Sequence, residues 1–194
     1  RRPAMRAQVQ QSAAEWLFIV VSGVVKSFRD LPSGKRRVMA FLFARDIFGL
    51  AERGHYVNTT QAVTPVTLYR IELATLAAMF RRDAELQFQF LCKITHELRE
   101  ALHLRIVVGR RDAVGRVAMF LRMLEDETGQ QRGHAPHIDI PMSRSDTANY
   151  LGLSLEAVSR ACRTLERTGI VAFDDLHSAR IISRSRFDKL ASAV

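Results

Sequence analysis

Three polar side chains, Glu156, Ser159 and Arg160, lie three and four positions apart along the chain. On a helix this spacing places them on one face. An arginine there can donate two parallel hydrogen bonds to guanine O6 and N7, a glutamate can accept one from a cytosine amino group, and a serine can do either. The alternative is a surface ion pair between Glu156 and Arg160, worth a few tenths of a kcal/mol. The surrounding elements decide between the two interpretations.

Residues 141–169 have the pattern of a helix, a tight turn and a second helix. Ser143 is suited to cap the first helix, and Gly152 lies in the middle of the turn. Ser154 is placed to cap the second helix, with an acidic residue in its first turn. Gly169 is placed to end that helix. The segment therefore predicts a helix-turn-helix whose second helix carries the three polar side chains.

A hairpin is expected directly after the second helix. The apolar runs 170–173 and 179–182 flank a polar turn, which is the pattern of a wing behind a helix pair. In such motifs the first turns of the second helix meet base edges, and helix N-termini and nearby polar groups hold phosphates. The expected base contacts are Leu155, Glu156, Ser159 and Arg160. The expected phosphate contacts are Ser143, Arg144, Ser145, Ser154 and Arg163.

The first part of the chain has the pattern of antiparallel β structure. Short β-branched and aromatic runs between residues 16 and 76 are separated by turn-forming segments. Helical patterns follow over residues 72–80 and, for much longer, over 83–110. Asp112 is suited to cap a third helix that reaches Glu125, and a polar loop is expected from there to His137.

These elements predict an α+β chain of three parts. An antiparallel β-roll is expected over residues 1–81, a long dimerisation helix over 82–111, and a winged helix-turn-helix domain over 112–194. Because the sequence opens with Arg1 and not with methionine, part of the natural N-terminus is expected to be missing.

The long helix carries apolar residues at heptad spacing. Arg105 interrupts this stripe, and a shift of one position restores it. A helix that packs only on its own domain would explain part of this pattern. With Phe88 included, however, the apolar surface exceeds what one facing sheet needs, so a homodimer is expected. The expected interface consists of Leu91, Ile94, Leu98, Ala101 and Leu102.

Charge and cysteine content limit the function classes. The net charge is +9, but residues 113–194 contain 11 lysines and arginines against 10 aspartates and glutamates. Binding of double-stranded DNA by that half must therefore depend on a few well-placed cations. The two isolated cysteines form neither a disulfide framework nor a metal-ligand pattern, which favours a reducing cytoplasm. No apolar run reaches the roughly 20 residues that span a membrane, so no membrane association is expected.

The predicted β-roll, the long helix and the segments DAVGRVAMFL and LGLSLEAVSRACRTLERTGIV resemble the Crp/Fnr superfamily of bacterial transcription regulators. The resemblance covers essentially the whole chain, and the E-x-x-S-R pattern at 156–160 is similar to that of the Fnr and FixK branch. It implies a cyclic-nucleotide-binding-like roll and a homodimer on a pseudo-palindromic site with TTGAT half-sites. It also implies contact with RNA polymerase through residues 126–134, although a solvated connector explains that loop equally well.

The resemblance also indicates which ligand residues to look for in the roll. Cyclic-nucleotide-binding relatives hold the ribose and phosphate with a Gly-Glu pair and an Arg-Ser pair. This chain has Gly49 and Leu50 at the first place and Tyr56 and Val57 at the second. Without the arginine a buried phosphate has no charge partner, so no cyclic nucleotide is expected. Two isolated cysteines cannot replace the four that hold the iron-sulfur cluster of Fnr, so no cluster is expected either.

Two residues keep further interpretations open. His55 lies near the position where a haem-binding relative has a histidine, although it is also explained as an exposed loop residue. Cys162 is a redox switch if Arg160, Arg163 or the helix dipole stabilises its thiolate, and is otherwise a buried structural thiol. No nucleophile elbow, phosphate-binding loop or metal-ligand pattern indicates an enzyme. The main hypothesis is thus a dimeric DNA-binding regulator without a cofactor, and the alternative is a regulator gated by haem or another small molecule in the roll.

Overall fold

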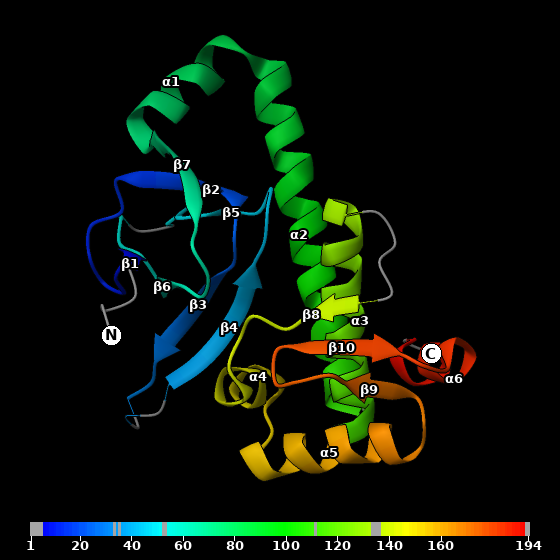
Figure 1. The fold of residues 1–194 in the computed structure, drawn as a ribbon. Helices are drawn as coiled ribbons and strands as arrows, with labels where there is room; N and C mark the ends of the chain where they lie inside the picture. Colours follow the sequence, from blue (N-terminus) through cyan, green and yellow to red (C-terminus); the bar gives the residue numbers. More distant parts are fainter. Residues whose placement is uncertain are drawn as a thin grey trace. The chain divides into compact units, whose positions relative to one another are not determined.

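The computed structural model describes residues 6–32, 34, 36–51, 54–110, 112–132 and 137–192 (Figure 1). The chain divides into two compact units, residues 1–104 and 105–194. No helix in these described ranges is long and apolar enough to cross a membrane.

The first unit contains two antiparallel sheets, as the sequence predicts. The larger sheet has the order β1-β6-β3-β4, formed by Arg6–Gln8, Thr59–Ala62, Val25–Asp30 and Arg36–Leu42. The smaller sheet has the order β5-β2-β7, formed by Ile47–Phe48, Trp16–Ser22 and Thr67–Glu72. The strands β1, β5 and β6 were not expected, because they are only three, two and four residues long and so carry little β-strand pattern.

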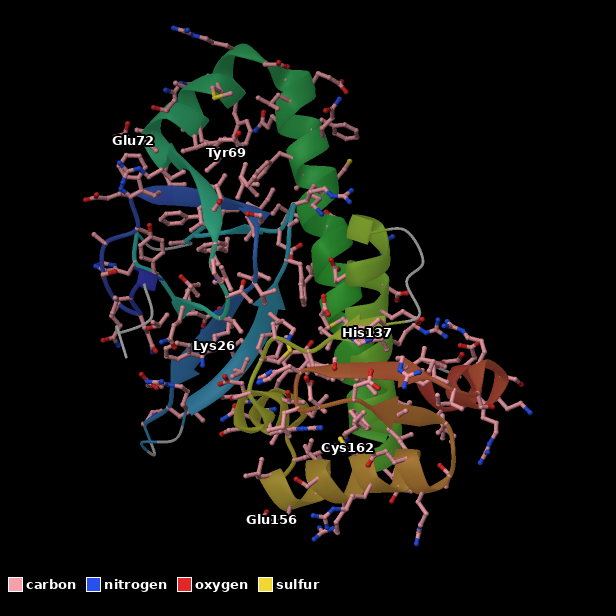
Figure 2. The ribbon with its side chains drawn as sticks, in the orientation of Figure 1. Lys26, Tyr69, Glu72, His137, Glu156 and Cys162 are labelled. Atoms are coloured by element: carbon pink, nitrogen blue, oxygen red, sulfur yellow. The ribbon has the colours of Figure 1, made fainter. Side chains whose placement is uncertain are left out.

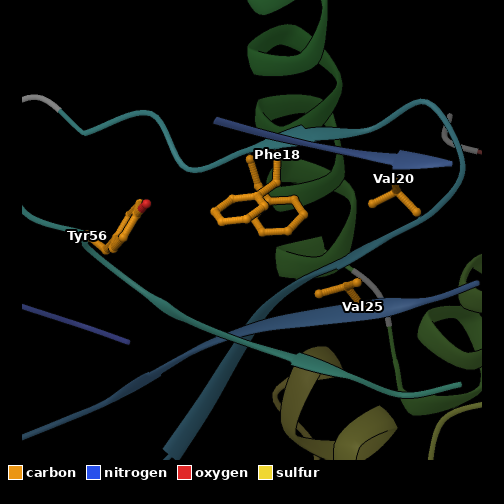
Figure 3. Close-up of a cluster of buried hydrophobic side chains, with 5 residues drawn as sticks. Phe18, Val20, Val25 and Tyr56 are labelled. Carbon is orange, nitrogen blue, oxygen red and sulfur yellow. The ribbon is translucent and has the colours of Figure 1, made fainter. Parts of the chain in front are cut away.

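The core of the first unit is a cluster of buried side chains, Phe18, Val20, Val25, Phe48 and Tyr56 (Figure 3). The rings of Phe18 and Phe48 stack at a centroid distance of 5.0 Å. The hydroxyl of Tyr56 accepts a hydrogen bond from the Trp16 backbone N–H at 3.1 Å and donates one to the Trp16 carbonyl at 3.0 Å. The buried tyrosine therefore has its polar atom satisfied within the roll.

Two helices follow the sheets, α1 from Leu73 to Arg82 and α2 from Ala84 to Arg110, as expected. Asp83 separates them, and its Oδ1 accepts a hydrogen bond from the Leu86 N–H at 2.9 Å. An aspartate in this position satisfies one of the unpaired N–H groups at the start of a helix. The cap thus explains why α2 begins directly after α1 ends.

The second unit consists of helices around a three-stranded sheet of order β8-β10-β9. Its helices are α3 (Ala113–Arg132), α4 (Arg144–Leu151), α5 (Leu155–Arg167) and α6 (Arg184–Ala191), and its strands are β8 (His137–Asp139), β9 (Val171–Phe173) and β10 (Ser178–Ile181). As predicted, Asp112 caps α3, because its Oδ1 accepts a hydrogen bond from the Gly115 N–H at 2.8 Å. The largest fully buried side chains of the second unit are Phe120, Leu121, Leu124, Ile138, Met142, Leu151, Leu165 and Phe187.

The polar loop predicted from residue 126 is wrong over its first part, because α3 continues to Arg132. Glutamate, glutamine and arginine are good helix formers, and Gly129, the one glycine between residues 126 and 132, costs only about 1 kcal/mol, so nothing ends the helix earlier. The rest of that loop, residues 133–136, lies outside the described residues.

Helix α6 was not predicted, and charged contacts attach it to α3. Arg184 binds the Glu125 carboxylate, with Nη1 2.5 Å from Oε1, and Arg122 forms an ion pair with Asp188. The guanidinium groups of both arginines lie over the ring of Phe187, which is fully buried. The helix therefore depends on tertiary contacts that a reading of its own eight residues does not reveal.

Candidate nucleic-acid interface

The first helix of the predicted motif, α4, begins and ends where its sequence signals lie. Ser143 is extended, and its Oγ accepts a hydrogen bond from the Asp146 N–H at 3.1 Å. At the other end Gly152 has a φ of 65°, a left-handed conformation that glycine adopts without steric cost. The turn is thereby fixed, and it directs the chain into α5.

The second helix, α5, is capped at both ends as predicted. Ser154 Oγ accepts a hydrogen bond from the Ala157 N–H at 3.1 Å. Gly169 has a φ of 62°, and its N–H donates to the Glu166 carbonyl at 2.8 Å, while the Ile170 N–H donates to the Leu165 carbonyl at 3.0 Å. These two bonds satisfy the last carbonyl groups of the helix.

The inner face of α5 is apolar and buried. Its residues Val158, Ala161, Cys162 and Leu165 are at most 5% exposed. The predicted packing residues of α4, Ala148 and Leu151, are buried as well. Burial of this face fixes which residues of α5 must point outwards.

The outer face of α5 brings the predicted base-contacting residues together. Leu155, Glu156 and Arg160 are exposed and Ser159 is half-buried, and together with Arg163 they line one open groove. Figure 2 shows Glu156 and Cys162 on opposite sides of α5. We name the set Leu155, Glu156, Ser159, Arg160 the reading face. Within two helical turns it presents an apolar side chain, a carboxylate that accepts hydrogen bonds, a hydroxyl, and a guanidinium that donates several hydrogen bonds.

The carboxylate of Glu156 is kept ionised. Its pKa is lowered from the ordinary value, mainly by a hydrogen bond from its own backbone N–H and by one from Ser154, and to a smaller degree by the charge of Arg160. An ionised carboxylate accepts hydrogen bonds only, so Glu156 matches an amino group such as that of cytosine.

Four of the five predicted phosphate contacts lie on the surface near the two helix N-termini or along α5. Ser143, Ser145, Ser154 and Arg163 are exposed. Arg144 is half-buried, which was not expected: its Nη1 donates a hydrogen bond to Cys162 Sγ at 2.6 Å, and its guanidinium carbon lies 5.1 Å from the ring centroid of Phe173.

Cys162 is buried, and its surroundings favour the structural interpretation of this thiol. Burial raises its pKa, and the nearby charge of Arg144 opposes this only in part. The thiol therefore stays protonated at neutral pH, whereas a redox-sensing cysteine needs an accessible thiolate. The arginine that contacts the sulfur is Arg144 from α4, and not Arg160 or Arg163, which the redox interpretation would have required.

The wing is formed by β9 and β10, which pair antiparallel as predicted. Arg180 binds Asp174 in its turn with contacts of 2.9 to 3.1 Å, and these contacts lower the pKa of the Asp174 carboxyl. Asp175 Oδ1 accepts hydrogen bonds from the His177 N–H at 2.6 Å and from Ser178 Oγ at 2.9 Å. The turn is thus held by its own two aspartates, which nothing in the apolar pattern of the flanking strands indicated.

Comparison with known proteins gives matches over both units. Residues 115–190 match the Crp-like helix-turn-helix domain, and residues 9–83 match the cyclic nucleotide-binding domain. The nitrogen fixation regulation protein FixK of Azorhizobium caulinodans is 33% identical over 174 residues, which is 89% of this chain and 69% of the relative. The chain belongs to the Crp/Fnr family.

Further matches place this Crp/Fnr protein in the FixK branch and agree with its fold. The transcriptional activatory protein AadR of Rhodopseudomonas palustris is 29% identical over 188 residues, covering 95% of this chain and 77% of the relative. The solved structure of FixK2 from Bradyrhizobium japonicum has a TM-score of 0.88 at 29% identity, and the match covers 100% of this chain and 96% of that one. This Crp/Fnr protein is therefore a DNA-binding transcription regulator and not an enzyme.

The expected dimer residues of this Crp/Fnr protein lie on α2 as predicted. Leu91 and Leu98 are exposed, as is the neighbouring Phe88, and Ile94 is half-buried. The side chains of Ala101 and Leu102 lie outside the described residues. Apolar side chains that are nearly 60% exposed on one helix indicate a surface suited to a partner.

The structure describes Tyr56 and His55, two residues at the predicted sensor positions of this Crp/Fnr protein. Tyr56, which stands where the resemblance predicts an arginine, is 5% exposed and belongs to the core cluster described above. His55 is exposed, and its backbone forms a single β-bridge with Ala13. The tyrosine ring thus fills interior space of the roll with an apolar surface.

Proposed function

We propose that this regulator binds a pseudo-palindromic DNA site with TTGAT half-sites as a homodimer and activates transcription by contacting RNA polymerase. A bacterial regulator of this kind acts in the cytoplasm, where the chromosome lies. The feature that supports the proposal best is the reading face, which is exposed on a helix whose two ends and inner side are fixed.

Three of the four members of the reading face have a distinct base partner in the proposed complex. The Arg160 guanidinium donates to O6 and N7 of the guanine in TTGAT, and the ionised Glu156 carboxylate accepts from the cytosine amino group across the same base pair. Leu155, which is 47% exposed, supplies an apolar contact for a thymine methyl group. The hydroxyl of Ser159 can donate a hydrogen bond to a base or accept one from it. One G·C pair between A·T pairs is thus read from both strands.

Phosphate contacts supply the remaining affinity. The N-termini of α4 and α5 present backbone N–H groups, with Ser143, Ser145 and Ser154 beside them, and Arg144 and Arg163 supply charge. Because residues 113–194 have almost no net charge, each of these cations should account for a measurable part of the salt dependence.

The homodimer follows from the symmetry of such a site. A two-fold axis relates two half-sites whose centres lie about 34 to 36 Å apart, one turn of the DNA helix, and so requires two copies of α5 in matching orientation. The seam proposed for this dimer consists of Leu91, Ile94, Leu98, Ala101 and Leu102 on α2, and we name it the α2 seam.

Contact with RNA polymerase is proposed for residues 126–134. Within this range, residues 126–132 form the last turns of α3, and residues 133 and 134 lie outside the described residues. A relative, AadR, is named as a transcriptional activatory protein, which supports activation as the output.

We further propose that the regulator needs no cyclic nucleotide, iron-sulfur cluster or haem. Tyr56 leaves the phosphate of a cyclic nucleotide without a charge partner, and Cys92 and Cys162 lie in different units. Absorbance of the purified protein tests this proposal: no Soret band is expected, and a band that disappears in His55→Ala would instead support the haem-gated alternative. Calorimetric titration with cyclic AMP should give no binding heat.

A binding assay with matched variants tests the main proposal. Fluorescence anisotropy would compare a TTGAT palindrome with a scrambled duplex for the wild type, Arg160→Ala and Arg163→Ala. We expect Arg160→Ala to lower affinity for the palindrome and flatten the preference, because it removes base contacts. Arg163→Ala should weaken both duplexes alike, because it removes a phosphate contact. Equal losses on both duplexes for both variants would contradict the assignment.

A further inference from the structure

We propose that Cys162 and Phe173 are positioning residues for Arg144, and that they hold its guanidinium in the groove between α5 and the wing, where it binds a phosphate of the DNA strand. This inference rests on the proposed function and assigns a role to two residues that are not themselves expected to touch DNA. It also explains why a half-buried arginine stands at the first position of α4.

Three elements of the second unit meet at Arg144. The residue begins α4, its Nη1 donates to Cys162 Sγ of α5 at 2.6 Å, and its guanidinium lies over the Phe173 ring of β9 at 5.1 Å. Figure 2 shows Cys162 on the side of α5 that faces the wing. The guanidinium is therefore held from two sides, by a donor–acceptor contact and by an aromatic face.

These residues line a groove suited to a sugar-phosphate backbone. The groove has a volume of about 440 Å³, and its lining contains Arg144, Arg163 and the Ser159 hydroxyl as well as the apolar side chains of Phe173 and Leu176. The two guanidinium groups can bind phosphate oxygens. The apolar side chains offer a surface for the deoxyribose next to it. One nucleotide backbone unit thus meets groups of matching chemistry.

Two carboxylates in the same groove limit where the phosphate can lie. Glu166 and Asp175 also belong to the lining, and they repel a phosphate that comes close. The Asp175 carboxylate already accepts hydrogen bonds from the wing turn at 2.6 and 2.9 Å. The phosphate is therefore expected beside Arg144 and Arg163 and away from the outer end of the wing.

Cys162 and Phe173 are suited to position Arg144 because both side chains are uncharged. A free arginine side chain loses rotamer entropy when it binds, so prior immobilisation favours binding. A carboxylate partner would immobilise the guanidinium but also neutralise it, as Asp174 does for Arg180 and Glu125 does for Arg184. The protonated thiol of Cys162 and the ring of Phe173 hold Arg144 and leave its positive charge for the phosphate.

A double-mutant cycle tests the positioning role. Dissociation constants for the TTGAT palindrome and for a random duplex would be measured over a salt series for Arg144→Ala, Cys162→Ala and the double variant. Arg144→Ala should weaken binding to both duplexes by at least about tenfold and reduce the salt slope by about one unit per half-site. Cys162→Ala should weaken both by about three- to tenfold, and should have no further effect when Arg144→Ala is already present.

Two conservative variants separate positioning from folding. Cys162→Ser keeps a hydrogen-bond acceptor for Arg144 and should retain most of the wild-type affinity for DNA. Phe173→Leu, which removes the aromatic ring on the wing, should weaken DNA binding only while Arg144 is present. Cys92→Ala, which alters an exposed cysteine in the first unit, should leave DNA binding unchanged. Melting curves would verify that each variant is folded before its affinity is compared.

The outcomes distinguish this inference from the proposed function. If Cys162→Ala weakens DNA binding as much in the Arg144→Ala background as in the wild type, the thiol contributes by packing α5 and not through Arg144. That result overturns the inference. If Arg144→Ala changes neither the affinity nor the salt slope, no phosphate binds there and the inference also fails, although a wild-type preference for the palindrome would leave the proposed function intact. Loss of that preference in the wild type would instead refute the proposed function.

Discussion

Replacement of Leu98 by glutamate should dissociate the dimer. Leu98 is 57% exposed in the single chain, and complete burial of a leucine side chain contributes about 1.5 to 3 kcal/mol. Its burial at a partner is therefore worth about 1 to 1.5 kcal/mol per protomer, or about 2 to 3 kcal/mol per dimer, because a two-fold axis uses the residue twice. An unpaired carboxylate in the same place adds a cost of at least similar size.

The sum predicts that Leu98→Glu weakens the dimer by about a thousandfold or more. Sedimentation velocity over a protein concentration series would measure the dimer dissociation constant. Anisotropy would show weaker binding to the palindrome and an unchanged affinity for a duplex with one half-site. Met39→Glu, which alters an exposed apolar residue on β4, is the matched control and should leave the dimer intact. A Leu98→Glu protein that remains dimeric at the wild-type concentration range would refute the α2 seam.

Three further predictions concern the folded state that supports the reading face. Ser154→Ala should lower the free energy of unfolding of the second unit by about 1 kcal/mol, because it removes the α5 cap, and chemical denaturation with Ser185→Ala as an exposed control would measure it. Leu165→Ala should lower the free energy of unfolding by about 2 to 5 kcal/mol in the same assay, since this side chain is fully buried on the inner face of α5. Burial raises the pKa of Tyr150 to about 12. The folded state thus keeps a proton that the unfolded state loses above about pH 10, and stability should fall by about 1.4 kcal/mol between pH 8 and pH 11. Tyr150→Phe should remove this part of the alkaline loss, and an identical pH profile for both proteins would contradict the assignment.

The ends of α4 and α5 could be predicted from the sequence because their signals are local. Ser143 and Ser154 each bond an N–H group three residues away, and Gly152 and Gly169 adopt positive φ. The spacing of Glu156, Ser159 and Arg160 then fixes a common face from helical geometry alone. A local pattern is sufficient where the chain segment satisfies its own backbone groups.

Contacts between distant segments could not be predicted in this way. Arg144 and Cys162 are 18 positions apart, and nothing in either local pattern indicates that they meet. Arg160 and Arg163 are near Cys162 in sequence, but residues one or two positions apart on a helix point in different directions. The attachment of α6 to α3 is likewise tertiary, because Arg184 binds Glu125 and Asp188 binds Arg122. The residues of the reading face could therefore be predicted from the sequence, but the groove beside it could not.

The central claim is that Arg160 reads the guanine of each half-site, and a modified base tests it most directly. Replacement of that guanine by 7-deazaguanine removes the N7 acceptor and preserves base pairing. Loss of one charge-assisted hydrogen bond should weaken wild-type binding by about tenfold per half-site. The Arg160→Ala protein should bind the modified and unmodified palindromes equally, because it has no donor to lose. An equal loss in the wild type and in Arg160→Ala would contradict the claim.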